Sequence, residues 1–105
     1  MEIKTYRTAG GRSPVESYID RLPKSTKAEI LAAFRMIEKY GLTAPVSMRQ
    51  IRGKLWELRL TQTRLFYFCL DSDLMILLHA YKKQGQKAPQ REIETALRRM
   101  SEFIE

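Results

Sequence analysis

The spacing of apolar residues changes several times along the chain, and each change marks the boundary of an expected element. Residues 2–8 alternate and are rich in strand formers, so they predict a short first strand. Ser13 then provides a helix N-cap, Pro14 suits the first helical position, and Glu16 stands at capping-box spacing. A first helix therefore follows Ser13 and ends before Pro23. Its apolar residues Val15, Tyr18, Ile19 and Leu22 would share one face.

Two longer segments have the three- and four-residue apolar spacing of amphipathic helices. The first runs from about Ser25 to Tyr40 and meets a natural stop at Gly41. Its tight connection to the preceding helix favours an antiparallel pair. The second follows Ala88-Pro89 and runs to about Phe103. The apolar stripes are Ile30, Leu31, Phe34 and Ile37 in the first, and Ile93, Leu97, Met100 and Ile104 in the second.

Three strand-like runs lie between these two helices, at residues 54–60, 64–70 and 74–81. Their short connections predict an antiparallel meander. An irregular approach over residues 42–53 precedes them and is compatible with a strand near Met48–Ile51. Each run is apolar on both parities over part of its length, as in strands covered on one face and partly on the other. The residues expected in the core are Trp56, Leu58, Phe66, Phe68 and Cys69.

The element order predicts a compact α+β fold with a mainly antiparallel sheet, an N-terminal helical hairpin and a C-terminal helix. We expect the helices to pack on one face of the sheet. The other face, or the groove at its end, would then be open to a partner. No repeat, low-complexity tract or linker divides the sequence, so residues 1–105 are predicted to form one domain.

The composition, 44% hydrophobic and 30% charged, is ordinary for a globular protein. No apolar run approaches the roughly 18–20 residues that cross a bilayer. The N-terminus lacks the apolar core of a signal peptide. The single cysteine, Cys69, cannot form an internal disulfide. Together these features favour a cytoplasmic protein.

The net charge of +7 adds a preference for polyanionic partners, such as nucleic acid, an acidic membrane surface or an acidic protein. The excess is concentrated in residues 49–87, which hold eight basic and three acidic groups. A mildly basic protein with no such partner remains an alternative interpretation. No phosphate-binding glycine loop is present, and one histidine and one cysteine cannot build a standard zinc site. We therefore expect no metal and no cofactor.

Cations dominate the candidate chemistry of the strand region. Arg59 and Arg64 flank a hairpin-like gap, so they are expected near each other on neighbouring strands. The next strand ends in His79, Tyr81, Lys82 and Lys83. These cations either cap strands in water or bind phosphate, which arginine matches with its planar fork. RNA supplies its own nucleophile, the 2′-hydroxyl, so such a site can cleave RNA without metal if a base and an acid are present.

The runs IRGKLWELRL, TRLFYF, ILLHAYKKQGQKAP and EIETALRR resemble the RelE/ParE toxin superfamily, and HigB-like phage-type toxins within it. The resemblance spans nearly the whole chain. It implies a compact domain with a curved antiparallel sheet. It also implies one of two activities, because RelE- and HigB-like members cleave mRNA on the ribosome whereas ParE-like members poison gyrase.

The resemblance also implies roles for individual residues. Arg64 matches the arginine of the family's R-L-x-Y strand, which contacts the scissile phosphate. Lys83 falls where RelE-like members have a second catalytic arginine, with Lys82 beside it, and Arg59 matches a basic position of the preceding strand. RelE-like enzymes can use a lysine of that strand as base, and here the neighbouring residue is Glu57. The further candidates are His79 as a catalytic residue and Arg49, Arg52, Lys54 and Lys87 as contacts to RNA.

We therefore expect the toxin of a type II toxin–antitoxin module that cleaves mRNA in the ribosomal A site. The alternatives are a ParE-like gyrase inhibitor and a non-toxic nucleic-acid or partner-binding module. Either toxin implies a cognate antitoxin, with a helix-turn-helix domain in HigB-like systems. Operator DNA would be bound only through that antitoxin.

Overall fold

The computed structural model describes residues 1–104 and confirms a compact α+β fold. Glu105, the last residue of the predicted domain, lies outside the described residues. No helix in residues 1–104 combines the length and the apolar character needed to cross a membrane. In chain order the elements are β1 (Glu2–Thr5), α1 (Pro14–Asp20), α2 (Lys24–Tyr40), the 3-10 turn η1 (Gly41–Thr43), β2 (Ser47–Arg52), β3 (Leu55–Arg59), β4 (Thr63–Asp71), β5 (Leu74–Lys82) and α3 (Gln90–Met100).

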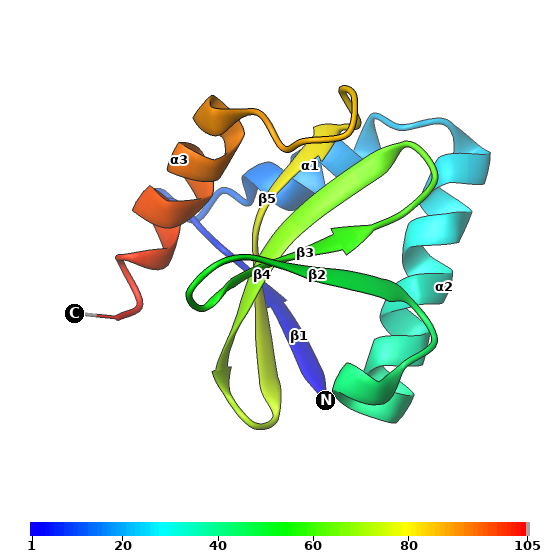
Figure 1. Ribbon diagram of the computed structural model, residues 1–105, viewed down its shortest axis with the longest axis horizontal. Coiled ribbons are helices and arrows are strands. Elements are labelled where there is room, and N and C mark those ends of the chain that lie inside the picture. Colours follow the sequence, from blue (N-terminus) through cyan, green and yellow to red (C-terminus); the bar gives the residue numbers. More distant parts are fainter. Residues whose placement is uncertain (105) are drawn as a thin grey trace.

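The strands form one mixed sheet in the order β1-β5-β4-β3-β2. Strands β2 to β5 run antiparallel to their neighbours, which confirms the predicted meander. Strand β1 forms one edge of the sheet and pairs parallel to β5. Helices α1 and α2 then carry the chain from β1 to β2, which forms the opposite edge (Figure 1). The description of the helical hairpin as N-terminal is wrong, because the chain starts with the short strand that residues 2–8 predict and the two helices follow it.

The start of α1 follows the local signals in the sequence. The Ser13 hydroxyl accepts a hydrogen bond from the backbone N–H of Glu16 at 3.1 Å, as an N-cap should. The carboxylate of Glu16 accepts from Arg7 at 3.0 Å. This ion pair joins the helix to the segment after β1. The first strand is consequently shorter than predicted, since the chain turns between Thr8 and Arg12.

Helices cover both faces of the sheet, which corrects the expectation that they pack on one. Helices α1 and α2 bury one face with Val15, Ala33 and Ile37. Helix α3 lies against the other face and buries it with Ile93, Ala96 and Met100 (Figure 1). The side chains of β4 alternate between the two cores. Leu65 and Tyr67 contribute to the first core, and Phe66 and Phe68 to the second.

Two apolar residues expected in the core lie at the surface. Leu31 of α2 is 46% exposed, because α2 turns only the side of Ile30, Ala33 and Ile37 toward the sheet. Trp56 of β3 is 37% exposed, whereas its neighbours Leu55 and Leu58 are fully buried. The apolar pattern was right about the elements and wrong about these two positions.

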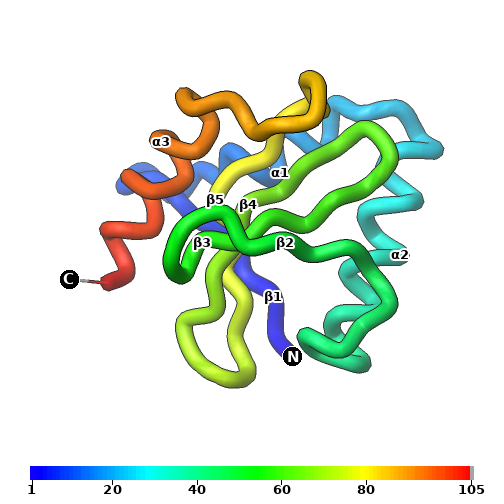
Figure 2. Tube along the Cα trace, viewed as in Figure 1, coloured from blue at the N-terminus to red at the C-terminus, as the bar shows by residue number. Residues whose placement is uncertain are grey.

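The N-terminus is held against the end of α2. The terminal ammonium of Met1 donates to the backbone carbonyl of Glu38 at 2.8 Å. Figure 2 shows this end of the chain beside the last turn of α2, at the side of the molecule away from α3. Edge strand β1 is therefore fixed at its start, and residues Met1 and Ile3 pack partly against the α1–α2 core.

Truncation of the core face of α2 should destabilise the fold strongly. Ile37 is fully buried, so Ile37→Ala should lower the free energy of unfolding by about 2–5 kcal/mol. Leu31→Ala, on the exposed side of the same helix, should change it by less than about 1 kcal/mol. Urea unfolding followed by circular dichroism measures both values. Similar losses in the two variants would contradict the packing described for α2.

Candidate functional site

Two arginines face each other across the β3–β4 hairpin. The register pairs Arg59 with Arg64, and Arg64 with Tyr81 of β5, so the three side chains share one face of the sheet. This is the face that α3 covers further along, and we call it the cation face: Arg59, Arg64, Glu57 and Tyr81. Like charges directly opposite each other are unfavourable in a sheet. The arrangement therefore needs carboxylate, carbonyl or other anionic oxygens near the two guanidinium groups.

Glu57 supplies the one carboxylate of the cation face. It is only 4% exposed, and its Oε2 accepts a hydrogen bond from the Tyr81 hydroxyl at 2.6 Å. Its Oε1 lies 3.7 Å from Nε of Arg59. Burial, and then the hydrogen bond to Glu57, raise the pKa of Tyr81, so the phenol keeps its proton and remains a donor. Tyr81 and Arg59 together hold a buried carboxylate in a fixed position.

Arg64 is itself 7% exposed and is tied to the adjacent turn. Its Nη1 donates to the backbone carbonyl of Leu60 and, at 3.2 Å, to that of Thr63. These bonds close the connection between β3 and β4, so Arg64 has a structural role. A guanidinium has five N–H donors, and these two bonds start from one nitrogen. The others leave it able to bind an anion that reaches the cation face.

The two lysines at the end of β5 have different positions, because Lys82 is the last residue of the strand and Lys83 follows it. Lys82 pairs with Thr63 in the register and lines a small hollow with Tyr18 and Leu22, on the face that α1 covers. Lys83 follows the strand and is exposed. Its backbone N–H donates to the carbonyl of Gln62 at 2.9 Å, which places it at the end of the sheet that holds Arg59 and Arg64. Lys83 thus lies beyond the end of the sheet that holds Arg59 and Arg64, whereas Lys82 lies on the opposite face.

His79, the only histidine in the chain, is enclosed by α3. Its Nε2 lies 2.6 Å from Oε1 of Glu92, and Nη1 of Arg99 lies 3.2 Å from its Nδ1. Because a guanidinium only donates, Nδ1 must be the acceptor and Nε2–H must donate to Glu92. Burial lowers the pKa of His79 despite the raising effect of Glu92, which agrees with a neutral ring. Both nitrogens are occupied, so His79 holds α3 in place in this conformation.

The four expected RNA contacts fall into two groups. Arg49 and Lys87 line one hollow of about 260 Å³ on the cation-face side, together with Glu57 and Ile93. Arg49 also pairs with Glu57 in the register, so it is the nearest basic residue on β2. Arg52 is exposed at the turn between β2 and β3, and Lys54 lines a different hollow beside Trp56. Arg49 and Lys87 therefore belong with the cation face, whereas Arg52 and Lys54 lie at its margin or beyond it.

The sequence pointed to Glu57 as a candidate but did not indicate which residue it bonds to. It placed Tyr81 at the end of a strand but did not indicate its role. The signal for Glu57 was a lone acid inside an otherwise apolar and basic strand, LWELR. Its bond to Tyr81 joins residues 24 positions apart, and no local pattern predicts it. The contacts of His79 to Glu92 and Arg99 depend equally on how α3 packs.

The cation face combines two paired arginines with one buried carboxylate, which lies beside Arg59. Guanidinium groups can bind phosphate oxygens, and a carboxylate is one of the groups that act as a general base. The hollow of Arg49 and Lys87 opens onto the same carboxylate, which gives a polyanion a basic approach to it.

Comparison with known families gives one match. The family described as phage derived protein Gp49-like (DUF891) matches residues 17–101, which cover the chain from α1 to the end of α3. This family is toxin-like and belongs to the RelE toxin-like superfamily. No curated protein is similar enough to the chain to count as a relative.

The neutral state of His79 makes the stability of the fold depend on pH. Because its pKa is lowered in the folded protein from an ordinary 6.5, the unfolded chain binds the proton first as pH falls. The free energy of unfolding should therefore decrease as pH drops through 6.5 toward the lower pKa of the folded state. His79→Gln keeps a donor and an acceptor, so it should lack this component. Urea unfolding of both proteins at about pH 7.5 and about pH 5.5 measures it. An equal pH dependence in the two would exclude His79 as the cause.

Proposed function

This chain belongs to the Gp49-like family of phage-derived proteins, and on that premise we propose that it is a HigB-like toxin that cleaves mRNA. The toxin would be part of a type II toxin–antitoxin module and would act in the cytoplasm, in the A site of the ribosome. One observation carries the proposal: Arg59 and Arg64 are directly opposed on the sheet, with the buried carboxylate of Glu57 beside them.

The proposed reaction uses the 2′-hydroxyl of RNA as nucleophile. Glu57 takes the proton of this hydroxyl, O2′ forms a bond to phosphorus, and the bond from phosphorus to the 5′-oxygen breaks. Arg64 and Arg59 stabilise the negative charge that develops on the phosphate oxygens. The products are a 2′,3′-cyclic phosphate and a 5′-hydroxyl. Lys83 is our candidate for the acid that protonates the leaving oxygen.

The arrangement around Glu57 supports its assignment as base. The Tyr81 hydroxyl occupies Oε2, which leaves Oε1, on the side of Arg59, for the substrate. Arg49 and Lys87 would hold the RNA backbone in the hollow that reaches this carboxylate. The ribosome would add the strained geometry of the mRNA, which lowers the barrier by orienting the reacting atoms.

A gyrase-directed binding activity is the second candidate, and one observation favours it. Arg64 bonds to the carbonyls of its own turn, and His79 is held by Glu92 and Arg99. Fewer groups of this site are therefore free for catalysis than its number of basic residues suggests. In that case the cation face would bind an acidic surface of the enzyme, and no RNA would be cut.

Induction of the protein in cells distinguishes the two functions. The nuclease predicts new transcript 5′ ends within codons, carrying a 5′-hydroxyl, soon after growth stops. Intact transcripts with arrested replication and DNA-damage signalling would instead support the gyrase inhibitor. Normal growth on induction of a folded protein would exclude both.

Substitutions on the cation face should separate chemistry from folding. Arg64→Ala should restore growth, and Glu57→Gln should slow cleavage by about 10²–10³-fold.

Lys83→Ala should slow cleavage by at least about tenfold, whereas Lys82→Ala should change it by less than about threefold, because Lys82 lies on the other face. Rates measured on ribosomes programmed with a defined mRNA test each variant. Arg64→Lys, which keeps the charge and loses the fork, controls for the structural role of Arg64. Larger losses in Lys82→Ala than in Lys83→Ala would contradict the assignment.

A further inference from the structure

A small hollow lies at the end of the sheet where β5 finishes, on the face that α1 covers. We call it the Lys82 hollow, and its volume is about 250 Å³. Figure 1 shows the segments that form it at one end of the molecule: the connection from α1 to α2, the turn from β3 to β4 and the end of β5. The residues that line it, all but two of which have a side-chain hydrogen-bond donor, are Tyr18, Leu22, Pro23, Thr26, Gln62, Thr63 and Lys82.

Helix α2 begins at this hollow, and its first turn has no side-chain cap. The N-cap position is occupied by Pro23, whose side chain accepts no hydrogen bond. The first N–H groups of a helix have no partner within it, and they carry a partial positive charge that attracts anions. The first turn of α2 contains no acidic residue that would neutralise this charge. The start of α2 therefore presents backbone donors beside the hollow that Pro23 and Thr26 line.

Thr63 adds a buried hydroxyl that faces the same hollow. The register pairs Thr63 with Lys82, so both side chains lie on the α1 side of the sheet. Thr63 is only 1% exposed, and within residues 1–104 its hydroxyl makes no hydrogen bond. No side-chain oxygen of the described chain is both completely buried and unpartnered, so the small exposed area of Thr63 includes its hydroxyl. Because a buried hydroxyl normally has a hydrogen-bond partner, this one indicates a ligand in the hollow.

The charges of the Lys82 hollow indicate the chemistry of that ligand. Lys82 is the one ionised side chain of the lining, which contains no carboxylate. Glu29 of α2 also reaches the β3–β4 turn, but its Oε2 accepts from the N–H and the hydroxyl of Thr61, at 3.0 and 2.8 Å. Burial raises the pKa of Tyr18, so its phenol remains a donor. A lysine, a helix N-terminus and several neutral donors are complementary to a phosphate group.

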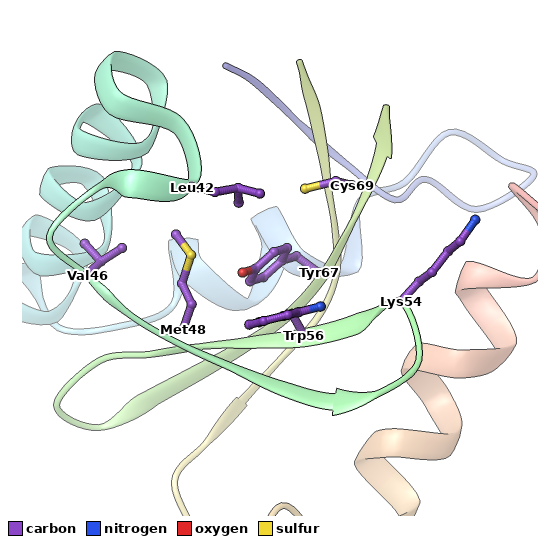
Figure 3. A pocket seen from close by; sticks show the side chains of 7 residues that line it. All are labelled: Leu42, Val46, Met48, Lys54, Trp56, Tyr67 and Cys69. Atoms are coloured by element: carbon purple, nitrogen blue, oxygen red, sulfur yellow. The ribbon is translucent and has the colours of Figure 1, made fainter. Parts of the chain in front are cut away.

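A larger hollow on the same side of the sheet has a different character. Its volume is about 490 Å³, and Figure 3 shows Lys54, its one ionised side chain, pointing away from the others. The rest of its lining is mainly apolar: Leu42, Val46, Met48, Trp56, Tyr67 and Cys69. On this side of the sheet, the donors that suit an anion are therefore concentrated in the Lys82 hollow.

The Lys82 hollow and the cation face adjoin each other at the β3–β4 turn. Thr63 of the hollow directly precedes Arg64 of the cation face. Successive residues of a strand point to opposite faces of the sheet. A strand of nucleic acid that passes around this end of the sheet can therefore place one phosphate at Arg64 and a flanking phosphate at Lys82.

We propose that the Lys82 hollow binds a phosphate group, and that this phosphate belongs to the RNA strand whose reacting phosphate lies on the cation face. The assignment to RNA rests on the proposed function, whereas the phosphate site itself does not. The start of α2 and the Thr63 hydroxyl donate to the phosphate oxygens, and Lys82 neutralises their charge. The hollow holds the strand and leaves the reaction to the opposite face, so it changes the affinity for RNA and spares the cleavage rate on saturated ribosomes.

Titration of the purified chain with inorganic phosphate tests the site directly. At constant ionic strength, the amide NMR signals of residues 24–26 and of Thr63 should shift together. Lys82→Gln should weaken binding at least about tenfold, because it removes a charged donor. Thr63→Val keeps the shape of the side chain and removes the hydroxyl, so it should weaken binding at least about threefold. Lys39→Gln removes the same charge at an exposed position near the other end of α2 and should change the affinity by less than about twofold.

The phosphate titration has outcomes that would overturn the site. Shifts confined to the cation face, or absent from the start of α2, would do so. Equal weakening by Lys39→Gln and Lys82→Gln would show that phosphate responds only to net charge. Lys82 is exposed, so its substitution tests the site even where Thr63→Val disturbs folding, and near-ultraviolet circular dichroism controls for the fold of each variant.

A short DNA strand distinguishes RNA from a small phosphate compound as the source of the phosphate. Tetradeoxyadenylate has linked phosphates and no 2′-hydroxyl, so the proposed reaction cannot cleave it. It should shift the amide signals of Thr63 and Arg64 with one dissociation constant, at least about tenfold below that of inorganic phosphate, because its phosphates are linked. Lys82→Gln should reduce the slope of log affinity against log salt concentration by about 0.7, the value for one phosphate of a single strand.

The two titrations separate the statements of the proposal. Shifts at the hollow with inorganic phosphate but not with the DNA strand would overturn RNA as the source and assign the hollow to a small phosphate compound. Neither titration requires cleavage. Intact transcripts after induction would therefore refute the proposed nuclease, and phosphate binding to the purified chain would still decide whether the Lys82 hollow is a phosphate site.

Discussion

Burial of β4 on both of its faces is the constraint on which the rest of the structure depends. From Thr63 to Phe68 its side chains are buried regardless of parity, so apolar cover is needed above and below the sheet. Helices α1 and α2 provide it on one side and α3 on the other. The consequence is two separate surfaces. The cation face lies on the α3 side, and a hollow lined by Leu42, Met48 and Trp56 lies on the opposite side, where α2 ends.

The polar groups on the α3 side are arranged to tolerate this burial. A carboxylate removed from water is stable only with partners, and Glu57 has Tyr81 and Arg59. His79 is neutral and bonded to Glu92 and Arg99, so it fixes α3 without burying an isolated charge. Arg64 is held by carbonyls of the hairpin turn. Preorganised groups of this kind need little rearrangement when a substrate arrives, which is the property that electrostatic catalysis requires.

The sequence by itself determined most of the secondary-structure elements and part of the cation face. The N-cap at Ser13, the meander of β3, β4 and β5, and the pairing of Arg59 with Arg64 follow from local periodicity and turn spacing, which act between near neighbours. Only the tertiary structure decided which face each helix covers. That choice enclosed His79, joined Tyr81 to Glu57 and left Trp56 exposed. These outcomes depend on contacts between residues far apart in the chain, and local periodicity carries no information about such contacts.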